Sequence, residues 1–171
     1  MERIVNFFIN LFGGLTASAF GREILVFIIS MMPILELRGG LLAAALLKVN
    51  PVTGYIVSMI GNIIPVPFIL LFITKILDWM ERSKIGWINK LGNAIRRKAD
   101  KNSGKIEKYG YVGLLLFVGI PLPGTGAWTG CLIASLLNMD RKKSFIYTLL
   151  GIVMASIIMM ILSYGIVSNL I

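Results

Sequence analysis

The sequence repeats itself, because a copy shifted by 90 residues without a gap aligns with the original at a series of informative positions. The aligned pairs are Pro33 with Pro123, Gly40 with Gly130, Ala44 with Ala134, Tyr55 with Phe145 and Gly61 with Gly151. Each copy is an apolar stretch interrupted by Pro and Gly, followed by a long apolar run. Apolar segments interrupted at corresponding positions in two halves are typical of transporters whose site lies at the membrane midplane.

The composition indicates an integral membrane protein, since 57% of the 171 residues are hydrophobic and a soluble domain of this size could not bury them. The excess of 17 Lys and Arg over 8 Asp and Glu is explained by membrane topology and anionic headgroups, so we expect no nucleic-acid partner. The chain has no His and a single cysteine, Cys131. We therefore expect no metal site, no cofactor and no catalytic residue.

Both broken segments allow two interpretations. Residues 22–48 and 109–138 are long enough to span a bilayer, but Pro33 and the Pro-Gly stretch at 121–126 interrupt helical hydrogen bonding in their middle. Each is followed by a run without charges, at 52–74 and 144–163. Either four kinked helices cross the membrane, or each broken segment is a re-entrant hairpin and only the following run crosses.

The positions of the basic residues favour the hairpins. Residues 75–108 carry ten Lys and Arg, and three more lie at 141–143. Four spans would place these clusters on opposite faces, whereas a re-entrant second hairpin places both on the cytoplasmic face, as the positive-inside rule requires. The predicted fold is an all-α integral membrane protein with two inverted repeats, each a re-entrant helical hairpin plus one transmembrane helix, with amphipathic interfacial helices.

The chain is expected to form one membrane domain over residues 1–171, located in the plasma membrane. Its predicted parts are an amphipathic helix at 3–20, repeat 1 at 22–80, a basic cytoplasmic amphipathic linker at 81–108 with a polar connector at 100–104, and repeat 2 at 109–171. The 139–143 loop is expected to be cytoplasmic. The first helix could span the membrane or lie on it, and the stretch ending in Ala17-Ser18-Ala19 also resembles a secretory signal, although Asn6 and Asn10 interrupt its apolar part.

Glu36 and Arg38 are the strongest candidates for a substrate or ion site. Ionisable residues in the hydrocarbon region are costly and mark ion pathways, proton relays or ligand sites by default. Burial favours the neutral form of an isolated Glu36, whereas a neighbouring Arg38 favours its charged form, a balance that suits a proton-coupled carboxylate. The alternative is structural: a self-neutralising pair that fixes the tip of the hairpin.

The remaining candidates are residues that free backbone groups or point polar groups into the membrane. Broken helix ends can bind ions, although the same residues also serve tight turns and close packing. Asn62 could reach a cavity or bond to a neighbouring helix, and Trp128 could stack on a ligand cation or belong to the core. The set of candidates is completed by Gly39, Gly40, Pro121, Pro123, Gly124, Thr125 and Gly126.

Several of these motifs resemble the small multidrug export protein family: Pro33-Ile34-Leu35-Glu36-Leu37-Arg38-Gly39-Gly40, Gly61-Asn62 with Pro65-Val66-Pro67-Phe68, and Lys108-Tyr109-Gly110 leading to Pro121-Leu122-Pro123-Gly124-Thr125-Gly126. The resemblance implies drug export. More distantly, the layout resembles the DedA/VTT superfamily, which implies transport of lipids or polyprenyl-phosphate carriers. In that superfamily arginines surround the second proline motif, whereas this chain has Gly119 and Gly124 to Gly126 there.

The predicted function is a small membrane transporter that moves an amphiphilic small molecule or a lipid headgroup through a midplane site, with proton or cation coupling through Glu36. A cationic drug would use Glu36 and Trp128, and an anionic lipid phosphate would use Arg38 and the hairpin amides. The alternative is a non-transporting scaffold that binds anionic lipid or a partner through its basic face. An enzyme is disfavoured, and a homodimer could enclose the cavity.

Overall fold

The computed structural model describes residues 2–122 and 124–168, and all of their regular elements are helices. In chain order they are α1 (Glu2–Leu11), the 3-10 turn η1 (Gly13–Ala17), α2 (Ala19–Met31), α3 (Glu36–Leu46), α4 (Pro51–Ile63), α5 (Pro65–Arg82), α6 (Gly86–Gly119), α7 (Ala127–Leu136) and α8 (Arg141–Ser168). The predicted all-helical class is confirmed.

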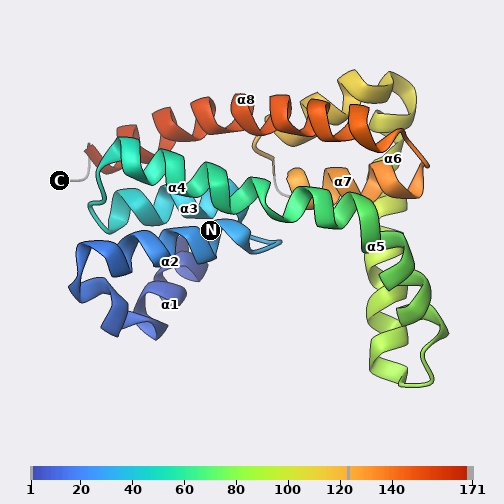
Figure 1. Cartoon of the computed structure of the whole chain (residues 1–171), viewed down its shortest axis with the longest axis horizontal. Coiled ribbons are helices and arrows are strands. Elements are labelled where there is room, and N and C mark those ends of the chain that lie inside the picture. Colours follow the sequence, from blue (N-terminus) through green and yellow to red (C-terminus); the bar gives the residue numbers. More distant parts are fainter. Residues whose placement is uncertain (1, 123, 169–171) are drawn as a thin grey trace.

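Two helical segments turn back near the middle of the long axis of the molecule (Figure 1). Helix α2 ends at Met31, Met32 after it has extended backbone angles, and the chain reverses through Pro33 into α3. Helix α6 ends in the same way at Gly119, since Ile120 after it is also extended, and the chain reverses into α7. Figure 1 shows the two reversals next to each other, with α2 and α3 toward one end and α7 toward the other.

The ends of α3 and α7 repeat each other bond for bond. Lys48 and Asn138, which lie 90 residues apart, both have left-handed backbone angles, with φ of 53° and 51°. The amide that follows each one, of Val49 or Met139, donates to the carbonyl of Ala44 or Ala134. The next helix is then capped by a side-chain oxygen of Asn50 or Asp140. The sequence repeat therefore extends to local backbone geometry at these helix ends.

Two segments are long and apolar enough to cross a membrane, Pro51–Arg82 and Arg141–Ser163. They contain the predicted runs at 52–74 and 144–163. Large apolar side chains on both segments are exposed, among them Ile56, Phe68, Leu71, Ile146 and Ile157. A surface of this kind is stable against lipid tails but not in water. Both segments are therefore candidate membrane spans.

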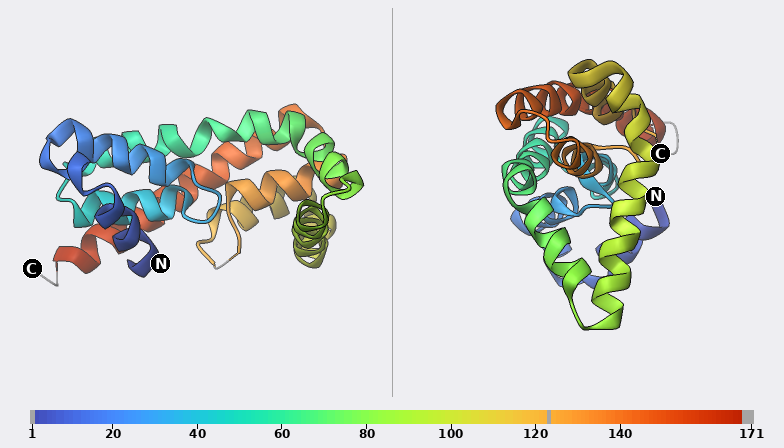
Figure 2. Two further views of the ribbon diagram at one scale, coloured as in Figure 1. Left: turned by 90° about the horizontal axis from the view of Figure 1, so that it is seen from below. Right: turned by 90° about the vertical axis from the view of Figure 1, so that its right-hand side faces the viewer.

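The predicted basic linker forms an arm in which the second half of α5 packs against the first half of α6 (Figures 1 and 2). Arg96 closes the arm by pairing with Asp78 at 2.8 Å and Glu81 at 2.5 Å. The expected connector at 100–104 is wrong, since helix continues through it and the chain breaks instead at Gly110, with φ of 58°. Only a residue without a side chain adopts this angle at low cost, so a glycine is needed at the break. The arm therefore ends at Gly110, next to the predicted start of repeat 2 at residue 109.

The N-terminal prediction of one helix over 3–20 is too long. Helix α1 stops at Leu11, and the consecutive Gly13 and Gly14 begin a 3-10 turn. Glycine disfavours α-helix by about 1 kcal/mol per residue, which accounts for the break. Val5 is buried and Ile9 half-buried, whereas Arg3, Asn6 and Asn10 are exposed, so α1 has an apolar and a polar face.

Close packing of α2, α3 and α4 depends on small residues, which leads to a stability prediction. A Cβ added to Gly40 would overlap Oγ of Ser30 and lie 2.9 Å from Oγ of Ser58. Gly40→Ala should therefore lower the free energy of unfolding by about 1–3 kcal/mol, measured by thermal unfolding in detergent. Gly86→Ala is the control, because nothing lies within 4 Å of its added Cβ. Equal stability of the two variants would contradict this packing.

Candidate functional site

Glu36 joins the two chain reversals. It is the first residue of α3, is only 5% exposed and has a left-handed φ of 51°. Its two carboxylate oxygens accept hydrogen bonds from the amides of Ala127 and Trp128, each at 3.0 Å. These amides are the unpaired donors at the N-terminus of α7, where a carboxylate is stabilised by both the bonds and the helix dipole. A side chain from the first reversal thus caps the helix that follows the second.

Gly126 makes this cap possible. It precedes α7 with φ of 137°, an angle that L side chains rarely adopt, and an added Cβ would overlap the carboxylate of Glu36. Gly126 occupies the position 90 residues after Glu36 in the repeat. The two halves of the chain therefore touch at equivalent positions, where one half supplies an acid and the other supplies the space for it.

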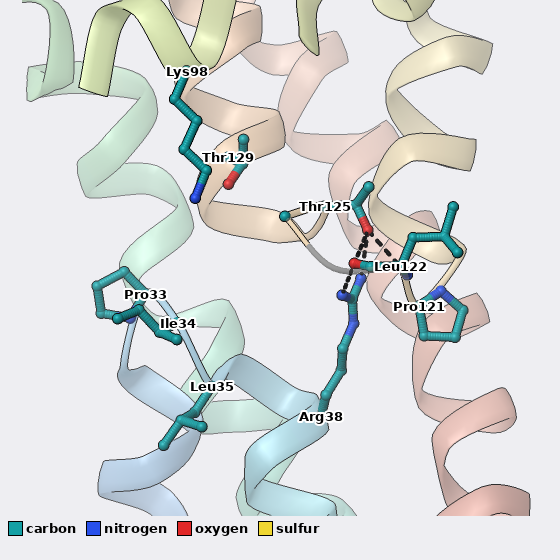
Figure 3. A pocket seen from close by; sticks show the side chains of 10 residues that line it. Pro33, Ile34, Leu35, Arg38, Lys98, Pro121, Leu122, Thr125 and Thr129 are labelled. Atoms are coloured by element: carbon teal, nitrogen blue, oxygen red, sulfur yellow. Dashed lines mark hydrogen bonds between the residues drawn. The ribbon is translucent and has the colours of Figure 1, made fainter. Parts of the chain in front are cut away.

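Arg38 holds the second reversal from the side (Figure 3). It is 6% exposed and donates to the carbonyl oxygens of Leu122, at 2.7 Å, and Ile120, at 3.3 Å. It also donates to Oγ1 of Thr125 at 3.0 Å, and that hydroxyl lies within hydrogen-bonding distance of the same two carbonyls. A broken helix end leaves carbonyl groups without their helical partners. A guanidinium has enough donors to bond to several of these carbonyls at once.

Among the described residues, Glu36 and Arg38 make no direct ion pair with each other. The ion pairs found within residues 2–122 and 124–168 are those of Arg96 with Asp78 and Glu81. The carboxylate of Glu36 instead accepts from the amides of Ala127 and Trp128, and the guanidinium of Arg38 donates to the 120–125 turn. Both charged groups therefore connect the two halves of the molecule.

A cavity of about 390 Å³ lies beside this junction. Its lining comes from both reversals and from α6, and includes Arg38, Lys98, Thr125 and Thr129 together with Pro33, Ile34, Pro121 and Leu122. Figure 3 shows Arg38 on one side of the space and Lys98 approaching from α6 on the other. A second cavity of about 260 Å³ shares Pro33, Ile34, Lys98 and Thr129 with it, and its remaining lining is mostly apolar. Together they offer a polar pocket continued by an apolar one.

Residues 36–158 match the model of a protein family described as "Putative small multi-drug export protein". The chain belongs to this family. The comparisons with curated proteins and with solved structures found no match. The matched stretch begins at Glu36 and includes every segment that lines the two cavities except Pro33 to Leu35.

Family membership and the two candidate spans together indicate a membrane protein of an export family, which is not described as a family of enzymes. Within the described part of the chain, no three residues of the types His, Cys, Asp and Glu form a group that could hold a metal ion. The distant likeness to the DedA/VTT superfamily stays a prediction.

The fold brings together only part of the candidate set for this family member. Pro121, Gly124 and Thr125 line the first cavity with Arg38, and Trp128 lines the second.

Gly39 and Gly40 instead face neighbouring side chains of the helix bundle, because an added Cβ would meet Leu35 or Ser30. Asn62 is buried outside the lining of both cavities, with no partner for its Oδ1 among the described residues. Pro123 lies outside the described residues.

Two polar lining residues of this site were missed at the level of sequence. Lys98 lies among the ten basic residues of 75–108, and nothing in the sequence separates it from the others. Thr129 follows Trp128 in an apolar helix and has no counterpart among the polar residues of the first repeat. The absence of an acid three or four residues away does not single out Lys98, because Lys90, Lys101, Lys105 and Lys108 share it.

Proposed function

We propose that this chain is a small membrane transporter that moves an amphiphilic small molecule or lipid headgroup through a site between two opposed re-entrant hairpins. The hairpins are residues 22–48 and 109–138, and the site is the cavity between their tips. The observation that carries the proposal is the junction itself, in which buried Glu36 and Arg38 of one tip hold the backbone of the other. Ionisable residues at such a depth are functional by default.

The repeated backbone geometry supports the inverted-repeat topology. Bonds that end α3 recur 90 residues later at the end of α7, and each is followed by a capped, apolar helix. The reversals lie side by side while their helices extend toward opposite ends (Figure 1). Irregular backbone at membrane depth is stable only when protein surrounds it or when it lines a wet cavity, and both reversals line the first cavity. On this topology the basic arm and the 139–143 loop are cytoplasmic.

Glu36 is the proposed coupling group. As a carboxylate it accepts from the amides of Ala127 and Trp128, and its protonation weakens both bonds. The tip of α7 is then freed from the tip of α3, and the cavity between them can open toward the other face. The mechanism is alternating access, in which one hairpin moves against the other around a fixed site.

Transport in proteoliposomes tests the proposal. Fluorescent amphiphiles with cationic, zwitterionic and anionic headgroups are offered separately, and movement between leaflets is followed by chemical quenching, with and without a pH gradient. We expect faster movement of at least one class than in protein-free vesicles, and loss of the response to pH in Glu36→Gln. Glu107→Gln is the matched control, because Glu107 is an exposed carboxylate of α6 whose hydrogen bond, among the described residues, is with Ser103.

No movement of any class by folded protein would contradict transport. That result would favour the alternative function, a scaffold that binds anionic lipid through the arm. Trp79 and Trp87 of the arm are 64% and 69% exposed beside its basic residues.

A further inference from the structure

The charges that face the cavities all have one sign. The first cavity is lined by Arg38 and Lys98, and the second by Lys98 alone among ionisable residues. A third cavity, of about 400 Å³, which shares Leu122 and Thr125 with the first, is lined by Lys108. No Asp or Glu is among the described residues that line these three spaces. Glu36 lies behind the lining, with its oxygens turned to the α7 amides.

Lys98 is the charge of the first two cavities whose donors are free, since Arg38 already donates to Leu122, Ile120 and Thr125. Within the described residues its ammonium group has no hydrogen bond and no ion pair, whereas Arg96 on the same helix is paired with both Asp78 and Glu81. Figure 3 shows the Lys98 side chain extending from α6 toward the gap between Thr129 and Ile34. Lys98 is exposed, so its ammonium group is free to pair with an anion that enters the cavity.

The rest of the lining fits an anion with an apolar tail. Thr129 offers a hydroxyl without a hydrogen-bond partner in the part of the chain that the structure describes, next to Lys98. Beyond it the second cavity is walled by Ile69, Ile73 and Leu132, which cannot serve a polar group but can hold a hydrocarbon chain. A ligand that spans both cavities therefore carries its charge at one end.

We propose that the site takes amphiphiles with an anionic headgroup of the phosphate type, held between Arg38 and Lys98, with the hydrocarbon tail in the second cavity. This assignment rests on the proposed transport function and narrows its substrate class. Three donor contacts of Arg38 already go to the 120–125 turn. Arg38 therefore holds the tip in place and acts on the headgroup through its positive charge. Lys98 and Thr129 supply the free donors. A cationic ligand finds no accessible carboxylate to pair with.

Binding to the purified full-length protein in neutral detergent tests this assignment. Dodecyl phosphate, dodecyltrimethylammonium and inorganic phosphate are titrated separately. We expect saturable binding of dodecyl phosphate, and an affinity about tenfold lower in Lys98→Gln, since a charge-assisted contact is lost. Lys90→Gln is the matched control: it removes an exposed lysine of the same helix that lines none of the described cavities. Thr129→Val, nearly the same in shape, should weaken binding by a smaller factor.

Each outcome has a distinct meaning. Preferred binding of the trimethylammonium amphiphile, or equal loss in Lys98→Gln and Lys90→Gln, would overturn the anionic assignment while leaving transport intact. Inorganic phosphate binding as tightly as dodecyl phosphate would overturn the amphiphile and indicate a free phosphate. Failure of transport for every class, by contrast, would contradict the proposed function and not this site alone.

Discussion

Gly126→Ala is expected to be the most destabilising single-methyl change in the chain. An L residue at φ of 137° stores about 1–3 kcal/mol of backbone strain. The added Cβ would also overlap the carboxylate of Glu36, so the acid must leave the amides of Ala127 and Trp128. Breaking a buried charge from its partners costs about 3–5 kcal/mol. The result should be a large fall in thermal stability and transport at the level of empty vesicles.

Two other glycines separate these causes. Gly124 also has positive φ, at 82°, but nothing lies within 4 Å of its added Cβ, so Gly124→Ala should show backbone strain alone. Gly104 is helical and open, and Gly104→Ala should be neutral or slightly stabilising, by up to about 1 kcal/mol. Thermal unfolding of the three variants in one detergent measures the order. If Gly126→Ala were no worse than Gly124→Ala, the contact between the two halves would be wrong.

Glu36→Ala is expected to have the second largest effect. It leaves two amide donors at the buried N-terminus of α7 without an acceptor, each costing about 1–3 kcal/mol, and removes the anion nearest to Arg38. Glu36→Gln should cost less, because its carbonyl oxygen can still accept from one of the two amides. Stability should therefore fall from wild type to Gln to Ala, measured as the melting temperature of the purified protein.

The exposed Glu107→Gln should lie within about 0.5 kcal/mol of wild type and serves as the reference for removal of a carboxylate. A Glu36→Ala variant as stable as Glu107→Gln would show that the acid does not hold α7. Wild-type stability of Glu36→Gln with loss of its pH response would, in turn, separate a coupling role from a structural one.

The sequence alone was sufficient for the helical class and for the two candidate spans, and it singled out Glu36 and Arg38 as candidates. It could not predict what these residues contact, because their partners lie 82 to 92 residues away in the chain. Charge proximity suggested a local pair two residues apart. In the structure, the backbone groups at two helix ends bond to these side chains. Buried backbone amides and carbonyls have no water to bond to, so Glu36 and Arg38 bond to them and not to each other.

Lys98 shows a different limit of sequence reasoning. Its position in a basic amphipathic segment predicted contact with lipid headgroups, and the arm does expose Trp87 and Ile85 in that manner. The location of the chain break decides which basic residue faces the site. Because the helix continues through residues 100–104 and the chain turns only at Gly110, Lys98 lies beside the two reversals and lines the first cavity. The preference of one glycine for a left-handed angle, not composition, sets this geometry.

The topology of the two hairpins is the central claim, and labelling of single cysteines tests it most directly. In a Cys131→Ala background, Asn50→Cys, Lys84→Cys and Lys142→Cys are exposed to a membrane-impermeant thiol reagent in oriented vesicles. Two re-entrant hairpins place positions 84 and 142 on one face and position 50 on the other. Labelling of 84 and 142 from the same side, opposite to 50, is the predicted result. Labelling of 84 and 142 from opposite sides would mean four ordinary spans and would contradict the account.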